Sequence, residues 1–448
     1  MIKEFLLKYK LWVTKPESAL VISFAIVILA GAILLTLPIS STPGNSTSFL
    51  DALFTSTSAT CVTGLIVFDT GTHFSIFGQV VILTLIQLGG LGIMTFTAIF
   101  VWLSKKAYSV QTHYTIQDTF GGDIEKLSIE NLLKFIVSAT FTIEGLGAAI
   151  LFFKLKEIYP TGKALYSAIF HSISAFCNAG FSIYSDSLIQ FRQSWITLTT
   201  IMLLIIFGGL GYPVLFELRE KILGKRKKTS FHTKLVLATT LSLIFGGAFF
   251  IWLGDHSLTI LDSLFQSVTT RTAGFNSVDI GKLPSSSLFI MIMLMFIGGS
   301  PGSCAGGIKT TTFSGYLILV KDWFFGEHRK RLFERKLTQE TKDKIKSVIT
   351  LAFSTVVVSF TILLFSEQAI ITTYREAFRN LLFEVVSAFG TVGLSTGITS
   401  NLSNVGKLVI IIDMFFGRVG PLAIVTSLLF GRRKKKKIDY PEQKIMIG

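Results

Sequence analysis

Four short stretches of this 448-residue chain place a glycine at a nearly constant distance from a phenylalanine. They read LFTSTSATCVTGL (53–65), IFHSISAFCNAGF (169–181), LFQSVTTRTAGF (264–275) and LFEVVSAFGTVGL (382–394). The spacing from phenylalanine to glycine is 10, 10, 9 and 10 residues. Glycine tolerates backbone dihedrals that a β-carbon disfavours. Each stretch therefore predicts a loop whose main chain, rather than its side chains, presents polar atoms to a ligand.

Backbone carbonyls arranged around one axis can replace the hydration shell of a potassium ion. Four such loops in one chain therefore predict one ion pathway, in which main-chain oxygens bind the ion. A short helix before each loop would add the partial negative charge of its C-terminal end. The predicted ion-binding residues are the glycine of each loop and the two residues before it: Val62, Thr63, Gly64, Asn178, Ala179, Gly180, Thr272, Ala273, Gly274, Thr391, Val392 and Gly393.

A second glycine cluster follows each loop, 25, 28, 24 and 24 residues after the first glycine. These clusters read LGGLG (88–92), FGGLG (207–211), IGGSPG (297–302) and FGRVG (416–420). Small residues often let membrane helices approach one another closely. Helix packing and a role in the ion pathway are therefore both open interpretations of the second clusters.

The elements that hold these loops are apolar segments. Half of the residues are hydrophobic and only 15% are charged, which indicates a membrane protein. Eight segments are long enough to cross a hydrocarbon core of about 30 Å, near 18–39, 74–103, 131–153, 194–218, 233–253, 286–320, 346–366 and 404–430. Four shorter segments suit re-entrant half-helices that do not span, at 48–60, 163–176, 257–270 and 374–389.

The positions of the charges predict the topology. The net charge of +15 could indicate nucleic-acid binding, but the basic residues cluster between apolar segments and in the tail RRKKKK (432–437). The gap at 40–73 has no Lys or Arg. Because basic loops stay in the cytoplasm, we expect both termini there, contact with membrane lipid and no nucleic-acid partner.

The predicted fold is an all-α membrane protein with four parallel repeats around one pseudo-four-fold pore. Each repeat is a span, a pore helix, a filter loop and a second span (M1-P-M2), which gives eight full transmembrane helices. The expected boundaries of the repeats are 1–110, 111–230, 231–345 and 346–448.

The third repeat carries an insertion, GGSPGSCAGGIKTTTF (298–313), within an apolar segment. It is superficially similar to a phosphate-binding loop, but that motif needs Lys directly after Gly, and here Ile308 intervenes. We therefore predict neither an enzyme nor a covalently bound cofactor. The glycines and Pro301 predict a broken helix. No other repeat has this insertion, so it is the expected moving part.

These motifs resemble the Trk/Ktr/HKT superfamily of potassium transporters, and within it the membrane subunits of bacterial Ktr systems (KtrB/KtrD type). The resemblance rests on TVGL (391–394), TRTAGFN (270–276) and FFGRVGP (415–421), and it covers essentially the whole chain. It implies potassium uptake across a bacterial plasma membrane, potassium as the substrate ion and sodium as an activator. It also implies a homodimer and a cytoplasmic ring of nucleotide-binding RCK subunits (KtrA/KtrC type).

The resemblance further implies a selectivity and a gate. Glycine in all four filter loops goes with preference for potassium in this superfamily. The departures VTGL, NAGF and TAGF from the channel motif TVGYG imply looser coordination. The insertion resembles an intramembrane loop that blocks the pore below the filter, and Arg418 matches the arginine that contacts it. The predicted gate residues are Gly298, Gly299, Pro301, Gly302, Gly306, Gly307, Lys309 and Arg418.

Several charged or polar side chains fall in or beside the apolar segments. Arg271, three residues before Gly274, would repel cations in the pathway, so we predict that it lies behind the filter and pairs with Glu384 or Asp262 as a brace. For Glu144, pairing with a neighbouring helix and ion coupling are both open. We expect His171 to be a hydrogen-bonded packing residue. Two acids flank the first loop and could concentrate cations at the mouth, namely Asp51 and Asp69.

One alternative mechanism remains open at this stage. Alternating-access cation symporters also use broken helices near the middle of the membrane. Their repeats are usually inverted pairs or parallel halves, whereas this chain has four parallel units. Turnover per protomer would distinguish the two, because channel-like flux exceeds the rate of a rocking carrier.

Overall fold

The computed structural model describes residues 16–42, 44–92, 129–325, 337–373 and 375–420. The predicted basic tail, most of the N-terminal arm and the ends of two predicted spans lie outside these residues. Within the described part the structure is helical, with two isolated β-bridges, Ser41 with Phe74 and Ile297 with Ile308, and no extended strand.

The same order of three helices occurs four times along the chain. The first of each set, called here the outer helices, are α2 (Pro16–Thr36), α8 (Ile129–Leu155), α12 (Phe231–Gly254) and α16 (Gln339–Ser366). The second, the short helices, are α3 (Phe49–Thr60), α9 (Thr161–Phe176), α13 (Ile260–Thr269) and α18 (Ala377–Phe389). The third helices are α5 (Ile76–Leu91), α10 (Trp195–Leu210), α14 (Ser285–Met295) and α19 (Asn404–Val419).

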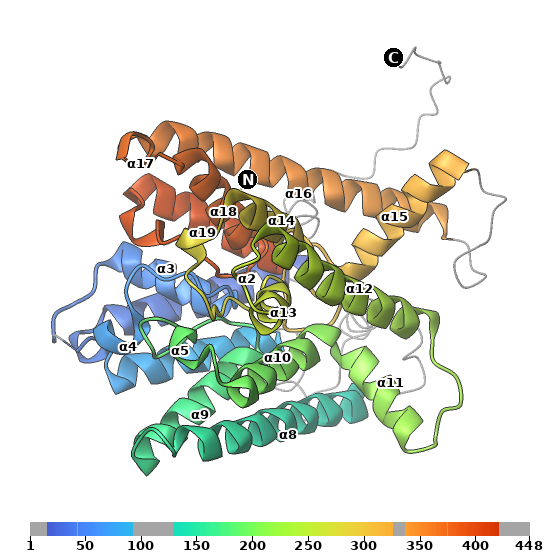
Figure 1. Ribbon diagram of the computed structural model, residues 1–448, viewed down its shortest axis with the longest axis horizontal. Coiled ribbons are helices and arrows are strands. Elements are labelled where there is room, and N and C mark those ends of the chain that lie inside the picture. Colours follow the sequence, from blue (N-terminus) through green and yellow to red (C-terminus); the bar gives the residue numbers. More distant parts are fainter. Residues whose placement is uncertain (1–15, 43, 93–128, 326–336, 374, 421–448) are drawn as a thin grey trace, which may run out of the picture.

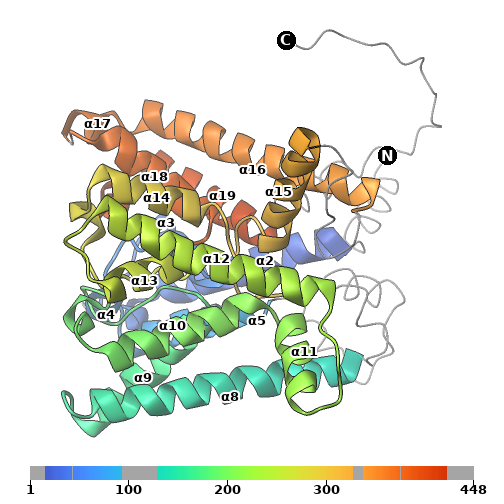
Figure 2. The same cartoon turned by 45° about the vertical axis from the view of Figure 1, so that its right-hand side comes forward.

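The remaining helices are connections. They are α4 (Thr70–His73), α11 (Tyr212–Ile222), α15 (Thr310–Phe325) and α17 (Gln368–Thr373), with 3-10 turns at Pro38–Ser40, Ile189–Phe191, Ile280–Lys282 and Thr399–Asn401. Figures 1 and 2 show α8 and α16 along opposite edges of the helical assembly, with the short helices between them.

The distribution of side chains is that of a membrane protein. Outer helices expose large apolar residues such as Phe153 on α8, Phe245 on α12 and Phe365 on α16, which are 62–78% exposed. Short helices instead bury hydroxyls, and every residue from Phe54 to Thr60 on α3 is buried. Because lipid solvates apolar side chains and not hydroxyls, polar groups gather inside where they can find partners.

Three helices of the described part are long and apolar enough to cross a membrane, α8, α12 and α16. A fourth candidate is the pair α10 and α11, bent by 102°. The prediction of one continuous span at 194–218 is therefore wrong, because α10 ends at Leu210 and the chain turns at Gly211. Gly211 has φ +88°, a conformation that glycine adopts without a steric penalty. The apolar segment at 286–320 is interrupted between α14 and α15, so the broken helix predicted at the insertion is confirmed.

Candidate functional site

The four predicted loops follow directly after the four short helices and share an unusual backbone. The residue two places before each glycine has a positive φ although it has a β-carbon, which is uncommon outside strained sites. These residues are Val62 (57°), Asn178 (60°), Thr272 (69°) and Thr391 (49°), and the glycines are Gly64 (96°), Gly180 (70°), Gly274 (77°) and Gly393 (89°). The same strain at four equivalent positions indicates one local structure formed four times.

The four glycines lie in a closed ring. A β-carbon added to Gly64 would lie 2.5 Å from the Ala179 carbonyl oxygen, and one on Gly180 would lie 2.8 Å from that of Ala273. One on Gly274 would meet the carbonyl oxygen of Val392 at 2.5 Å. One on Gly393 would meet the carbonyl oxygen of Thr63 at 2.0 Å. Each loop therefore faces the next in chain order, and the fourth faces the first.

A hydroxyl on each short helix forms a hydrogen bond with the main chain of the loop that follows. It stands four residues after the phenylalanine in every motif. Ser58 and Ser387 accept hydrogen bonds from the glycine amides of their loops, Gly64 at 3.0 Å and Gly393 at 3.1 Å. Ser174 donates to the Phe181 carbonyl at 2.8 Å, and Thr269 donates to that of Phe275 at 2.6 Å. The sequence analysis missed these residues, although a hydroxyl at a fixed place in all four motifs was a signal.

In the last three repeats a second hydrogen bond joins the short helix to the segment after its loop, and each time the two residues are eleven positions apart. His171 Nε2 lies 2.9 Å from Ser182 Oγ, and Gln266 Nε2 donates to Ser277 Oγ at 3.3 Å. Ser395 Oγ donates to Glu384 Oε2 at 3.0 Å. Each pair joins a short helix to the segment that follows its filter loop, so the expectation for His171 as a hydrogen-bonded packing residue is confirmed.

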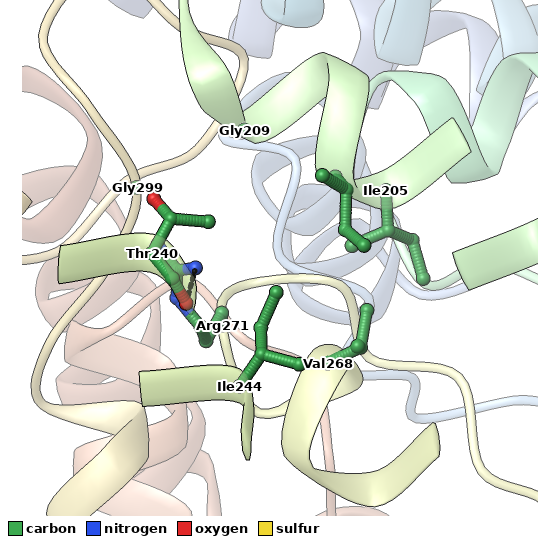
Figure 3. A pocket seen from close by; sticks show the side chains of 8 residues that line it. Ile205, Gly209, Thr240, Ile244, Val268, Arg271 and Gly299 are labelled. Atoms are coloured by element: carbon green, nitrogen blue, oxygen red, sulfur yellow. Dashed lines mark hydrogen bonds between the residues drawn. The ribbon is translucent and has the colours of Figure 1, made fainter. Parts of the chain in front are cut away.

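The predicted pairing of Arg271 with a carboxylate is wrong. Its guanidinium donates instead to the carbonyl oxygens of Thr240 and Gly298, both at 3.4 Å. Figure 3 shows Arg271 beside Thr240 and Gly299, across a small pocket from Ile205. Asp262 is nine residues away at the other end of α13, which is about 13 Å along a helix.

Both carboxylates have other partners. Asp262 accepts two bonds at 3.0 Å from Nε of Arg192 and one at 2.8 Å from its Nη2. Glu384 accepts from Ser395 and Thr399 in its own repeat. Burial raises the pKa of Asp262, but the hydrogen bonds from Arg192 and Thr259 outweigh it, so the pKa lies below the usual 3.8. Asp262 therefore ties the second repeat to the third outside the filter.

The inserted loop of the third repeat packs against the third helix of the second. The amides of Ser300 and Cys304 donate to the carbonyls of Gly209 (3.0 Å) and Gly208 (3.1 Å). In return, Tyr212 donates its amide to the Gly302 carbonyl at 3.0 Å. Unpaired backbone groups are costly away from water, and these bonds satisfy the groups that the broken helix leaves free.

The same loop also lies against the filter and the fourth repeat. The Gly307 amide donates to the Gly417 carbonyl at 3.2 Å. A β-carbon on Gly306 would lie 2.1 Å from Thr391 Oγ1, so the loop directly contacts a predicted filter residue. Gly298 donates its amide to Ile308 (2.8 Å) and Gly299 accepts from Thr310 (3.0 Å), which closes the base of the loop. The carbonyl of Pro301 lies beside Gly211, where a β-carbon would be 2.6 Å from it.

Arg418, on α19 of the fourth repeat, joins the inserted loop to the first repeat. Its guanidinium donates to the carbonyl of Cys304 in the loop and to that of Gly89 at the end of α5. Lys309 donates to the Ala305 carbonyl at 2.7 Å, within the loop itself. Arg418 is therefore a cross-link between the inserted loop and two third helices, while Lys309 supports the shape of the loop.

The second glycine clusters serve close packing. A β-carbon on Gly89, Gly208 or Gly417 would lie 1.8–1.9 Å from the carbonyl oxygen of Thr60, Phe176 or Phe389, at or near the end of the short helix in the same repeat. In the third repeat Gly298 instead meets the carbonyl of Gly306 at 1.9 Å. The packing interpretation therefore accounts for the first glycine of each cluster.

Three further acids, in or beside the apolar segments, each have a partner in the structure. Glu144 is buried and accepts a bond from Gln87 Nε2 at 3.1 Å, so it pairs with a neighbouring helix. Asp51 is paired with Lys407 at 2.7 Å and is not a free charge at the mouth. Asp69 caps α4 by accepting from the Thr72 amide at 2.8 Å.

Comparisons with known proteins place these features in a family context. A family model described as TrkH, a cation transport protein, matches residues 5–261 and 255–434. The chain is 39% identical to the Ktr system potassium uptake protein B of Bacillus subtilis (strain 168), over 97% of each chain. It is 37% identical to the potassium/sodium uptake protein NtpJ of Enterococcus hirae, again over 97% of each. The crystal structure of the potassium transporter TrkH from Vibrio parahaemolyticus has a similar fold, with a TM-score of 0.70 and 19% identity, over 93% of this chain and 85% of that one.

Proposed function

Because this chain belongs to the TrkH family of cation transport proteins, which are transporters and not enzymes, we propose that it carries potassium into the cell through a channel-like pore. The observation that supports this most directly is the closed ring of four filter loops, each with its glycine against the carbonyl of the next. Carbonyl oxygens held in a ring can replace the water around a potassium ion.

We propose the predicted M1-P-M2 architecture for the whole chain, with repeats at 1–110, 111–230, 231–345 and 346–448. The fourfold order of outer, short and third helices supports it. Eight spans and two cytoplasmic termini follow if the outer and third helices cross the bilayer and the short helices enter it from outside. The protein would then be a multi-pass plasma-membrane protein in a bacterium.

The ion preference follows from the filter. Glycine at all four ring positions adds no side chain to the ring, so main-chain oxygens are available to bind the ion, as potassium requires. The relatives are named for potassium uptake in Bacillus subtilis and for potassium and sodium uptake in Enterococcus hirae. We therefore propose potassium as the substrate ion and sodium as an activator.

We propose that the loop from Gly298 to Lys309 is the gate. It lies against Thr391 of the filter and bonds to the third helices of two repeats, and Arg418 anchors it. A cation at this depth would also repel potassium electrostatically. Two relatives are named as proteins B and D of a Ktr system, which fits a protein that works with further subunits. We propose that these are a second copy of this chain and a cytoplasmic RCK ring.

The second candidate is an alternating-access symporter. The 102° bend between α10 and α11 is the observation that favours it, since discontinuous helices are common in such carriers. Single-protomer turnover separates the two mechanisms.

The direct test is rubidium or potassium uptake by the purified protein in proteoliposomes, comparing the native chain with Gly64→Ser. Loss of uptake, or a shift toward sodium, supports the filter. Potassium-selective flux that is unchanged by the substitution refutes it.

A further inference from the structure

In each of the first three repeats, the outer, short and third helices meet at three residues of the same types and in equivalent positions. A glycine of the outer helix lies against a leucine of the third helix and a serine of the short helix; β-carbons added to these glycines would lie within 2.4–2.8 Å of both side chains. The sets are Gly31, Leu85 and Ser56; Gly147, Leu204 and Ser172; Gly247, Leu294 and Ser267. Each serine also donates to a carbonyl of the outer helix, at 2.6–2.7 Å.

The fourth repeat fills this junction differently. The leucine stands four residues before the first glycine of each second cluster, and in the fourth repeat that position is Asp413. The serine stands two residues after the phenylalanine of each motif, and there the fourth repeat has Val385. The hydroxyl comes instead from Ser359 on α16, whose Oγ lies 2.6 Å from Asp413 Oδ1. An apolar contact in three repeats is thus a carboxyl–hydroxyl pair in the fourth.

Asp413 is fully buried, and its Oδ2 has no hydrogen-bond partner among the described residues. The acids on the elements packed against α19 have other partners. Glu384 of α18 accepts from Ser395 and Thr399. Asp51 of α3 pairs with Lys407, and Glu367, which follows α16, accepts from Ser403. On α19 itself, Lys407 pairs with Asp51 and Arg418 donates to the carbonyls of Cys304 and Gly89. No described side chain therefore neutralises an ionised Asp413.

An ionised carboxylate in this position would be expensive. A buried charge without a counter-charge is strongly disfavoured, whereas a neutral acid is not. Ser359 Oγ donates to Asp413 Oδ1, and a neutral Asp413 keeps that bond with its proton on Oδ2, which leaves an uncharged hydroxyl and not a charge without a partner. The junction as built accommodates a carboxylic acid and not a carboxylate.

We propose that Asp413 is a proton-binding site that holds the gate closed while the proton is bound. Loss of the proton would leave a bare charge between α16, α18 and α19, and water entry or separation of these helices would relieve it. Arg418 lies five residues further along α19, about 7.5 Å along its axis, and it anchors the inserted loop through the Cys304 carbonyl. Displacement of α19 would therefore weaken the hold on the loop and raise basal flux at alkaline pH.

This inference rests on the proposed function for its gating consequence, but protonation itself can be measured without transport. The infrared difference between the native protein and Asp413→Asn should contain the carbonyl band of a protonated carboxylic acid at neutral pH. Absence of that band would overturn the proton site even if the protein transports potassium.

The gating consequence is tested by rubidium flux in proteoliposomes between about pH 6 and about pH 9. Native flux should rise toward alkaline pH, by at most about tenfold per pH unit for one proton. Asp413→Asn should keep the low flux of acidic pH throughout. The pair Ser359→Gly with Asp413→Leu, which supplies the glycine and the leucine of the other three junctions and keeps Val385, should do the same.

Two results would refute the gating role: a native flux independent of pH, or the native pH dependence retained in Asp413→Asn. Native protein that carries no rubidium at any pH would instead refute the proposed function, and the infrared band would still decide the proton site.

Discussion

The closed ring predicts a graded sensitivity to added β-carbons. In Gly393→Ala the new methyl group would lie 2.0 Å from the Thr63 carbonyl oxygen. Real β-carbons essentially never come within 3.0 Å of another heavy atom, so this carbonyl must move by about 1 Å, the difference between the two distances. A misplacement of about 1 Å in a preorganised site can cost about 100-fold in rate. We expect a loss of potassium uptake of that order.

The chain offers a matched control for this substitution. Gly397 has φ +92°, nearly the same as +89° for Gly393, but an added β-carbon would meet nothing within 4 Å. Alanine at either position incurs a similar backbone cost, about 1–2 kcal/mol for a left-handed residue. Only Gly393→Ala adds the clash, so the difference between the two variants measures the ring contact alone.

The assay is initial rubidium uptake at matched amounts of folded protein in proteoliposomes. The remaining ring positions should follow their distances, with Gly64→Ala and Gly274→Ala (2.5 Å) less affected than Gly393→Ala, and Gly180→Ala (2.8 Å) least. Equal losses in Gly393→Ala and Gly397→Ala would show that backbone strain, and not closure of the ring, sets the requirement for glycine.

Three further predictions concern the supports of the site. Arg418→Gln should raise basal rubidium flux, because the cross-link to the loop is lost; unchanged or lower flux in folded protein contradicts the gate. Ser387→Ala removes the acceptor for the Gly393 amide and should cost about 1 kcal/mol of stability, with lower potassium-over-sodium selectivity in competition flux. The pKa of Asp262 is lowered in the fold, so its stabilisation is present above the unfolded value near 3.9 and lost as pH falls further. Melting curves of Asp262→Asn should lack that acid-dependent loss, and an identical acid profile would exclude the pairing with Arg192 as its source.

Much of the site was predictable because its determinants are local. A glycine at fixed spacing after a short apolar segment predicted four loops, and each follows a short helix in the structure. The break in the helix before Thr310 was predictable from its glycines and Pro301, since both disfavour a continuous helix. The hydroxyl four residues after each phenylalanine, for example in Ser58 and Ser387, was equally visible in the sequence. Its hydrogen-bond partner was not, because that partner depends on how the following loop folds.

The partners of the charged side chains were not predictable. Arg271 and Asp262 are close in sequence, but Asp262 lies in the first turn of α13 and Arg271 lies beyond its last turn, while Arg192 reaches Asp262 from another repeat. The bend at Gly211 also escaped prediction, because GGLG within an apolar segment is equally typical of a packed continuous helix. The importance of Asp413 was not predictable either, because it depends on the leucine that occupies the same place in the other three repeats.

The amino-acid sequence by itself determined that four glycine loops follow four short helices and that one repeat is interrupted, because spacing and backbone preference act within a few residues. The tertiary structure alone decided which carbonyl each glycine faces, which backbone groups the inserted loop satisfies and where Arg418 reaches. Those contacts join residues more than 80 positions apart in the chain. They depend on how the four repeats pack against one another, which no local pattern encodes.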